Sequence, residues 1–221
     1  CRRWRATFLI FASLASLTWA FAGILNPAMS QLHAFVSEYS ARDQPWRYLF
    51  QTTDVIMGTS LCLAGLATLA WAGHRPLGRQ GWSGIGFVAG GLFSVLDALV
   101  TMDCSPTRSN ACLAAEEAGH VSPSHFVHVG TSTIVVIGFA LPILLLNSTM
   151  TRFRTFGLVV AWAWIVFTLL NGIGAMDWFD GTPMDYTGIW QRFSLALGAL
   201  WWLTLAADDV ITSRAQRRPV C

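Results

Sequence analysis

Long apolar runs separated by short polar segments are the dominant pattern along this chain. A helix needs roughly 20 residues, at about 1.5 Å each, to cross about 30 Å of hydrocarbon. Runs of that length lie at residues 4–25, 54–72, 82–102, 125–146, 156–176 and 189–206. Lipid offers the backbone no hydrogen-bond partner and the alternation of barrel strands is absent, so each run is predicted to be helical. We expect an all-α, polytopic membrane protein, with six transmembrane helices forming one domain over residues 1–221.

Composition supports this interpretation. Hydrophobic residues make up 54% of the chain and charged residues only 12%, whereas about 25% charged residues is usual in soluble domains. The formal net charge of +2 is too small to indicate a nucleic-acid partner. Membrane lipid is the partner that we expect, and the sequence identifies no protein partner.

Arginine positions predict the orientation of the helices. All 14 basic residues are arginine, and most share a side with both termini: Arg2, Arg3, Arg5, Arg75, Arg79, Arg152, Arg154, Arg214, Arg217 and Arg218. The opposite side holds Arg42, Arg47, Arg108 and Arg192. The positive-inside rule then places both termini in the cytoplasm, with the protein in the plasma membrane. The chain starts at Cys1 rather than Met, so we expect upstream residues to have been removed. The arginines after Cys1 favour a signal-anchor helix over a lipoprotein anchor.

The outward segments, residues 26–53, 103–124 and 177–188, are longer and more polar than the inward ones. Of the 12 carboxylates, all but Asp208 and Asp209 lie on the outward side. We therefore expect the functional residues to be on that side. Cys104 and Cys112 share the second segment, where an oxidising space favours a disulfide between them. Two free thiols or a metal site are the alternatives, although the lack of a CxxC partner argues against zinc.

Residues 31–41 in the first outward segment have helical composition. His33 and Ser37, four residues apart, would share a face of that helix, with Glu38 beside them. Such a helix could be only an amphipathic anchor at the membrane interface. Glu38 would still need a partner, and Arg42, four residues further on, is the nearest candidate.

Two carboxylates belong to predicted spans. Asp97 lies about 8 Å inside the outer end of its helix, at about 1.5 Å per residue, where a charge costs on the order of 3 kcal/mol. It should face the bundle and be paired, protonated or bound to a metal. An ion pair with Arg192, or a hydrogen bond to Ser94 or Thr101, is the structural alternative. Asp54 opens its span and could simply complement the helix dipole.

The fourth run starts with His125 and His128, whose spacing stacks two imidazoles on one helical face. With Asp97 or Asp103 they would supply three ligands and leave a fourth position for water, as a hydrolytic zinc requires. However, HxxH is a common pattern, and no HExxH motif is present. The alternative is a structural or pH-sensitive latch, in which the histidines bond to carboxylates of neighbouring helices.

Gln191 and Arg192 open the last run on the same side. Arg192 is expected to pair with Glu38 or Asp97, and its planar guanidinium could instead hold a lipid phosphate. We therefore place Arg192, Gln191 and Asp54 in a candidate substrate-binding set.

Several short motifs resemble those of the DUF998 family of prokaryotic membrane proteins, many of them actinobacterial. Residues 36–45 (VSEYSARDQP) and 50–58 (FQTTDVIMG) are similar to its SE-x-x-A-x-x-QP and D-x-x-x-G stretch. Further matches are Met102-Asp103-Cys104, the pair His125 and His128, and Gly188-x-x-Gln191-Arg192. The resemblance covers nearly the whole chain. It implies an integral membrane protein of about six spans and assigns no biochemical role.

A weaker similarity extends to the alkaline ceramidases, the progestin and adipoQ receptors and related intramembrane hydrolases. Those proteins combine Ser, Asp and several His near one membrane face, and they are taken to bind zinc and cleave lipid amides or esters. Ser37, Asp97, His125 and His128 are the corresponding residue types here. This chain departs from the pattern because HxxH replaces HxxxH, six spans replace seven, and the histidines are not in the last helix. The activity is therefore not transferred.

Three functions remain open on the sequence alone. The first is an outward-facing hydrolase of lipid or lipid-linked substrate, with or without zinc, in which Glu38 acts as general base. Its candidate residues are Glu38, Ser37 and Asp97 for catalysis, His125, His128 and Asp103 for metal, and Arg192, Asp54 and Gln191 for substrate. The second is a non-enzymatic subunit in envelope assembly, whose polar cluster locks the helix ends. The third is a transporter, which the lack of paired helix breaks and of an inverted repeat disfavours.

Overall fold

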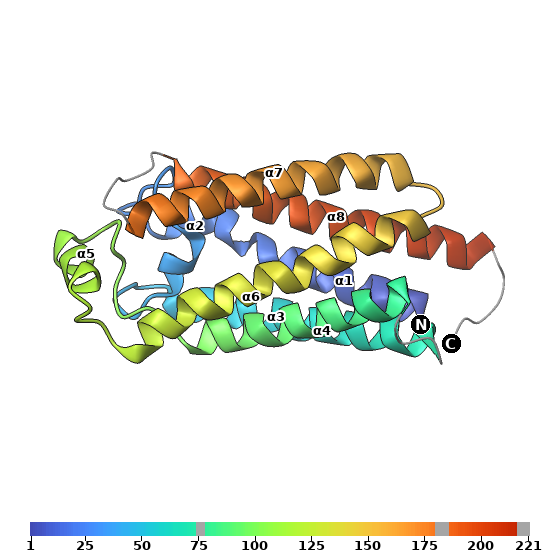
Figure 1. Ribbon diagram of the computed structural model, residues 1–221, viewed down its shortest axis with the longest axis horizontal. Coiled ribbons are helices and arrows are strands. Elements are labelled where there is room, and N and C mark those ends of the chain that lie inside the picture. The colour runs from blue at the N-terminus through green and yellow to red at the C-terminus, as the bar shows by residue number, and fades with distance from the viewer. Residues whose placement is uncertain (74–77, 180–185, 216–221) are drawn as a thin grey trace.

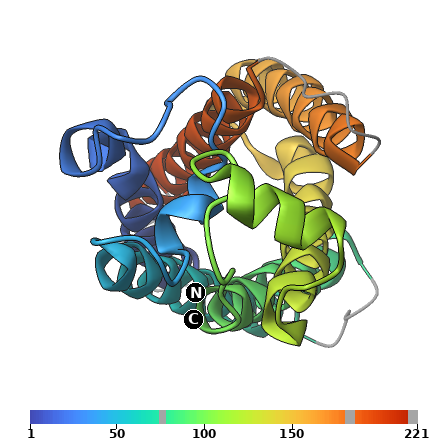
Figure 2. The same cartoon turned by 90° about the vertical axis from the view of Figure 1, so that its left-hand side faces the viewer.

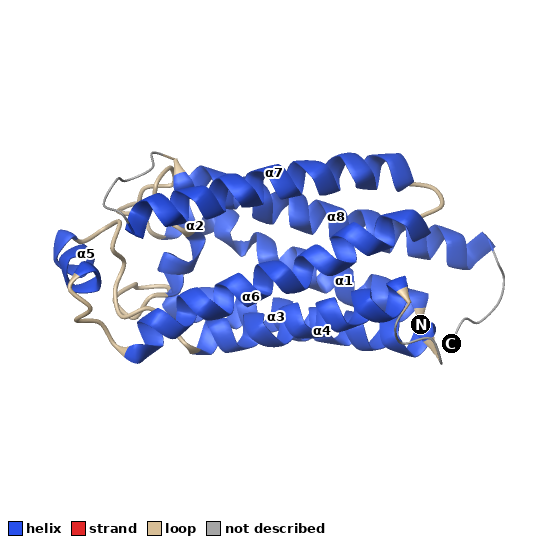
Figure 3. Cartoon of the chain, viewed as in Figure 1, coloured by secondary structure: helices blue, strands red, loops and turns tan. Residues whose placement is uncertain are grey.

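The computed structural model describes residues 1–73, 78–179 and 186–215, with the backbone alone for residues 175–179. All regular structure in these residues is helical (Figures 1 and 3). The elements, with η for a 3₁₀ helix, are α1 (Arg2–Ser16), η1 (Leu17–Phe21), α2 (Ala22–Leu25), η2 (Val36–Ser40), α3 (Arg47–Ala72), α4 (Arg79–Leu99), α5 (Asn110–Glu117), α6 (Pro123–Leu146), η3 (Asn147–Thr149), α7 (Arg154–Phe179) and α8 (Thr187–Ala215).

Six stretches of the described chain are long and apolar enough to cross a membrane. They are Arg2–Leu25, Arg47–Ala72, Arg79–Leu99, Pro123–Thr149, Arg154–Gly174 and Thr187–Ala215. Each overlaps one predicted run, so the prediction of an all-α fold with six spans is confirmed. The chain is a multi-pass membrane protein.

The spanning helices pack side by side in the order α6, α4, α3, α1, α8, α7 (Figure 2). The series does not close along its length. Although α6 and α7 follow one another in sequence, they lie close together only where η3 joins them, and they diverge toward the end that carries α5 (Figure 1). In the described residues, α7 packs along its length on α8 alone.

Glycines bring α4 close to helices on both of its sides. Gly58 of α3 lies against α4 so closely that an added Cβ would be 2.6 Å from the Gly91 carbonyl oxygen. On the other side, a Cβ on Gly86 would lie 2.7 Å from the carbonyl oxygen of Gly138 in α6. Small residues allow such close backbone approach, which drives helix association where lipid removes the hydrophobic driving force. This glycine pattern makes α4 the centre of a three-helix unit.

The buried face of α6 changes character along the helix. Its first half buries His125, His128 and Thr131, whereas its second half buries apolar residues that include Phe139 and Ile143. The apolar half joins a core contributed by α1, α3, α4, α6, α7 and α8. The bundle therefore has an apolar half and a half with polar interior groups.

The end of the bundle where α1 begins and α8 ends, which we call the base end, contains a buried ion pair. Nε and Nη2 of Arg5 each lie 2.7 Å from a carboxylate oxygen of Asp209. The Arg5 guanidinium also lies over the ring of Trp71, 5.1 Å from its centroid. The geometry is bidentate, which is the strongest arrangement for such a pair.

The last helix is longer than the sequence pattern predicted. We expected the final span to end at residue 206, with Asp208 and Asp209 in a polar tail, but α8 continues to Ala215 and both carboxylates are buried. Asp208 Oδ1 accepts the backbone N–H groups of residues 151, 152 and 153 at 3.0, 2.7 and 3.3 Å. These groups directly precede α7, and the N-terminal end of a helix favours an anion.

The opposite end carries a cap, defined here as residues 26–46 together with residues 100–122. Its helix η2 lies among the helix ends, and α5 lies across the end of the bundle (Figure 2). The ring of Tyr39 in η2 packs 5.4 Å from that of Phe50 in α3, and its hydroxyl accepts a hydrogen bond from Arg192 of α8 at 3.2 Å. The cap is therefore anchored to helices on both sides of the bundle.

The predicted helix over residues 31–41 is wrong. Turns occupy its first part, Phe35 is extended with φ −61° and ψ 148°, and only the short η2 follows. His33 and Ser37 consequently do not share a helical face. The Ser30 hydroxyl oxygen accepts hydrogen bonds from the backbone N–H groups of residues 32 and 33, which favours a turn here over a continuous helix.

Candidate functional site

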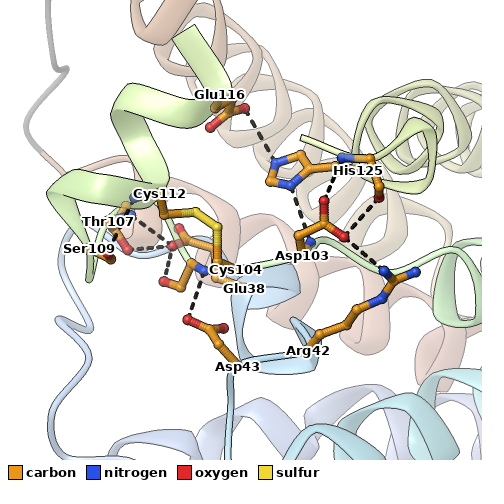
Figure 4. Close-up of a disulfide and its surroundings, with 12 residues drawn as sticks. Glu38, Arg42, Asp43, Asp103, Cys104, Thr107, Ser109, Cys112, Glu116 and His125 are labelled. Atoms are coloured by element: carbon orange, nitrogen blue, oxygen red, sulfur yellow. Dashed lines mark hydrogen bonds and ion pairs between the residues drawn. A yellow bond between two sulfur atoms is a disulfide. The ribbon is translucent and has the colours of Figure 1, made fainter. Parts of the chain in front are cut away.

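Glu38 holds the two parts of the cap together. Its carboxylate is fully buried and accepts the backbone N–H groups of Phe35 at 2.8 Å and Thr107 at 3.1 Å. The hydroxyls of Ser105 and Thr107 also donate to it (Figure 4). Burial raises the pKa of Glu38 above its ordinary value, and these hydrogen bonds act in the opposite direction. The predicted pairing of Glu38 with Arg42 is wrong, because hydroxyl and amide groups surround the carboxylate instead.

The predicted disulfide between Cys104 and Cys112 is present (Figure 4). It closes the loop that carries Ser105 and Thr107, the two residues whose hydroxyls hold Glu38. The covalent link therefore restricts the segment that forms the Glu38 environment.

Asp103 also links the two parts of the cap. Arg42 Nη1 lies 2.9 Å from its Oδ1, and the Ser122 hydroxyl donates to the same oxygen at 2.8 Å. Partial burial disfavours the charged form, but the bonds from Ser122 and the charges of Arg42 and His125 outweigh it and lower the pKa of Asp103. The carboxylate that we predicted as a metal ligand is thus engaged by an arginine and a serine.

The hydrogen bonds of His125 indicate its tautomer. Nδ1 accepts the backbone N–H of Asp103 at 3.2 Å, so in the neutral ring the proton lies on Nε2. Nε2 faces Glu116 Oε1 of α5 at 3.6 Å (Figure 4). His125 therefore points from the start of α6 into the cap.

His128 has the opposite arrangement. Its Nδ1 faces only acceptors: Asp97 Oδ1 at 3.2 Å, the Asp97 carbonyl oxygen at 3.2 Å and the Val100 carbonyl oxygen at 3.0 Å. Nδ1 must therefore carry a proton, and in the neutral ring Nε2 holds a lone pair. Nε2 is buried and has no hydrogen-bond partner among the described residues.

Asp97 joins α4 to α6. Thr131 donates to its Oδ1, and the Ser132 hydroxyl lies 3.0 and 3.1 Å from its two oxygens. The partners that we predicted, Arg192, Ser94 and Thr101, are not those found. Antiparallel packing of α4 on α6 brings the polar start of α6 beside the end of α4, which sequence spacing within one helix cannot reveal.

The candidate metal ligands do not converge. Nitrogen atoms of His125 face Asp103 and Glu116, whereas His128 faces Asp97. Within the described residues, no group of three or more His, Cys, Asp or Glu side chains could hold a metal ion. The donor set in this arrangement does not fit a tetrahedral zinc with three protein ligands, and we derive no chemical step through a metal.

Asp54 lies beside Asp97 but in different surroundings. Gly58 of α3 lies opposite Ser94 and Val95 of α4, because a Cβ added to Gly58 would be 2.9 Å from Val95 and 3.0 Å from Ser94. The two helices are antiparallel, and Asp54 is one turn before Gly58 in α3. Asp54 therefore lies at the same level as Asp97 of α4. The two carboxylates lie within electrostatic range of each other. Asp54 is only partly buried, and no hydrogen bond or ion pair joins it to any described residue.

Comparison with protein families matches residues 9–208 to the family described as "Protein of unknown function (DUF998)". The chain belongs to the DUF998 family. The matched region includes Glu38, Asp54, Asp97 and both histidines of α6, so the residues of this site lie within the family domain. No curated protein and no solved structure matches the chain, and the weaker similarity to the ceramidase superfamily therefore has no support.

In this DUF998 domain, Arg192 and Gln191 bind the cap. Arg192 Nη1 donates to the carbonyl oxygens of Ala34 and Gly188, each at 2.9 Å, and Gln191 accepts the backbone N–H of Val36. The predicted ion pair of Arg192 with Glu38 or Asp97 is wrong in the described structure. Arg192 Nε is buried without a hydrogen-bond partner in the described residues.

The remaining predicted residues have less defined places. No hydrogen bond links the Ser37 side chain to Asp97, His125 or His128 in the described part of the chain, so these catalytic candidates are not brought together. Asp180 and Asp185 of the third outward segment lie outside the described residues.

The sequence interpretation missed several polar residues. Ser105 and Thr107 form the Glu38 environment, and their place beside two cysteines in a short loop was the available signal. Thr168 of α7 was also missed. Its Oγ1 and the Oδ1 of Asn171, three residues later, are buried without hydrogen-bond partners in the part of the chain that the structure describes. This i, i+3 spacing puts both on one face of a mostly apolar helix.

Proposed function

We propose that this protein binds the polar head group of a lipid or lipid-linked molecule within the half of the bundle nearer the cap. Asp54 is the observation that carries this proposal. A carboxylate within a membrane span costs on the order of 3 kcal/mol unless it is paired, and Asp54 has no partner among the described residues. Hydroxyl or ammonium groups of a head group would supply the missing donors.

Other interior groups support the same site. The buried oxygens of Thr168 and Asn171 and the buried Nε2 of His128 also lack partners within residues 1–73, 78–179 and 186–215. Each buried polar group without a partner costs free energy that water or a ligand would recover. Counted from the cap ends of their helices, Asp54 and Asn171 lie at similar depths, His128 lies nearer the cap and Thr168 lies deeper.

The helix arrangement supports entry from the side. α6 and α7 diverge toward the cap, and α7 packs along its length on α8 alone in the described residues. A Cβ on Gly130 of α6 or Gly172 of α7 would meet nothing within 4 Å. We propose that a lipid enters between α6 and α7 from the leaflet next to the cap, which the arginine distribution makes the outer leaflet of the plasma membrane.

The test compares the bound lipid in Asp54→Asn and in wild type. Protein purified in mild detergent from its native membrane would be extracted and its lipids quantified by mass spectrometry. We expect Asp54→Asn to retain about tenfold less of the specific lipid, as befits loss of a charge-assisted hydrogen bond. Asp43→Asn, the same change in the cap, should retain it. Equal retention by Asp54→Asn and wild type would refute the proposal.

Hydrolysis of the bound molecule is a second candidate, and the geometry of His128 favours it. Asp97 beside Nδ1 orients the ring and would stabilise an imidazolium, as in other carboxylate–imidazole pairs. Nε2 would take a proton from water as the water oxygen bonds to an ester carbon. The imidazolium would return that proton to the leaving alkoxide. Glu38, which we predicted as the base, is already surrounded by four donors and suits a structural role better.

The hydrolysis proposal is tested in nanodiscs made from total membrane lipid. Wild type should release product that mass spectrometry detects, and His128→Gln should lower the rate about 100-fold or more. His125→Gln, which changes the histidine that points into the cap, should have a much smaller effect. No product from wild type, or equal loss in both variants, would count against His128 as the base.

A further inference from the structure

A second site lies at the base end, at the opposite end of the bundle from the cap and the proposed head-group site. A groove of about 450 Å³ is lined by Phe153, which directly precedes α7, by Phe156 in the first turn of α7, and by Leu203, Thr204 and Ala207 of α8. The Thr204 hydroxyl donates to the carbonyl oxygen of Leu200 at 2.7 Å, so the groove is lined by apolar atoms. Both helices are membrane-spanning, and the groove is therefore at the level of acyl chains.

Unpartnered positive charge flanks the groove. Arg152 and Arg154 adjoin Phe153, both are exposed, and neither guanidinium has a hydrogen bond or ion pair with a described residue. The nearby carboxylate of Asp208 forms no ion pair with either guanidinium, because it is 2% exposed and is bound by backbone N–H groups. Asp209 is equally buried and is paired with Arg5.

We propose that this groove binds an anionic phospholipid of the inner leaflet. One acyl chain lies between the two phenylalanines and α8, and the phosphate is held by Arg152 and Arg154. Arginine presents a planar pair of donors that matches a phosphate. The assignment is independent of the head-group site near the cap, because it involves the other leaflet and different residues.

The charge part of the proposal is tested by lipid titration. Phosphatidylglycerol and phosphatidylcholine would each be titrated onto the detergent-solubilised protein, with native mass spectrometry as the readout. Each arginine near an anionic lipid contributes roughly fivefold in affinity. The Arg152→Gln, Arg154→Gln double variant should therefore bind phosphatidylglycerol about 20-fold more weakly, with phosphatidylcholine binding unchanged. The Arg3→Gln, Arg79→Gln double variant removes the same charge from exposed positions outside the groove and should bind like wild type.

The groove part needs its own variants. Ala207→Phe fills the groove and should weaken binding of both lipids. Phe156→Ala removes one wall at an exposed position, where folding is unaffected, and should do the same. If the Arg3→Gln, Arg79→Gln control lost as much phosphatidylglycerol binding as the Arg152→Gln, Arg154→Gln variant, binding would depend only on the overall surface charge. That result would overturn the proposal. So would unchanged binding in both groove variants, or displacement of the lipid by inorganic phosphate.

Discussion

Asp208 and Asp209 at the base end have complete sets of partners, from three backbone N–H groups and from a bidentate arginine. At the cap end, Asp97 is similarly satisfied by α6, but Asp54 at the same level has no described partner. Matched buried charges give a single stable arrangement, whereas unmatched polar groups lower stability and are expected where function requires them. The comparison indicates that the buried carboxylates of the base end are structural and that the proposed head-group site lies toward the cap.

The largest expected effect is at the base end. Arg5→Ala removes the bidentate partner of the buried Asp209 and leaves only the longer contact to Arg2 Nε at 3.9 Å, which should lower the free energy of unfolding by about 3 kcal/mol. Thermal unfolding in detergent measures this. The double variant Arg5→Ala, Asp209→Ala removes both charges and should recover part of the loss. If the double variant is less stable than the single one by a further full increment, the two residues do not act as a pair.

The disulfide should have the next largest effect, and the effect should be confined to the cap. Replacing Cys104 and Cys112 by serine frees a short loop, for which chain entropy predicts about 2–3 kcal/mol. Hydrogen exchange should therefore increase at Glu38, Ser105 and Thr107, with little change at the base end. Uniform loosening of the whole bundle would contradict this separation of the two ends.

Replacing either of the two aspartates at the same level, Asp97 or Asp54, by asparagine should affect stability differently. Asp97→Asn disturbs bonds to Thr131, Ser132 and His128 and should cost about 1–3 kcal/mol. Asp54→Asn removes an unpartnered charge and should leave stability unchanged or raise it by about 1 kcal/mol. Melting temperatures of the two variants decide the matter. Destabilisation by Asp54→Asn as large as that by Asp97→Asn would mean that Asp54 has a structural role.

The smallest expected effect is a pH dependence from Glu38. Because its pKa is raised on folding, the folded protein binds this proton more tightly than the unfolded chain. The protonated Glu38 therefore contributes to stability at low pH. This contribution is lost as the pH rises from about 4.3, the pKa of Glu in the unfolded chain, through the higher pKa of Glu38 in the folded protein. Glu38→Gln lacks this titration, so its stability relative to wild type should increase with pH across that window.

Asp103 provides the matched control because its pKa is shifted the other way. Its contribution is present above about pH 3.9 and is lost as pH falls below that value. Asp103→Asn should therefore lose stability relative to wild type at neutral pH and match it in acid. Melting curves of both variants and of wild type from pH 3 to 8 test these two opposite pH dependences. If the stability of both variants relative to wild type changed with pH in the same way, the opposite pKa shifts of Glu38 and Asp103 would be refuted.

The sequence alone determined the membrane fold and the side on which polar residues gather. Apolar run lengths are decisive because hydrocarbon requires about 20 helical residues per span. The Cys104–Cys112 disulfide was also predictable, since the two cysteines share one short loop.

Only the tertiary structure decided which polar groups meet. Glu38 bonds to residues more than 60 positions away in sequence, and Asp97 bonds to α6 rather than to Arg192. Helix packing set by glycine contacts determines the level of Asp54 relative to Asp97. The histidines that share a spacing in sequence turn toward different partners, because each imidazole follows the donors and acceptors that neighbouring segments bring to it.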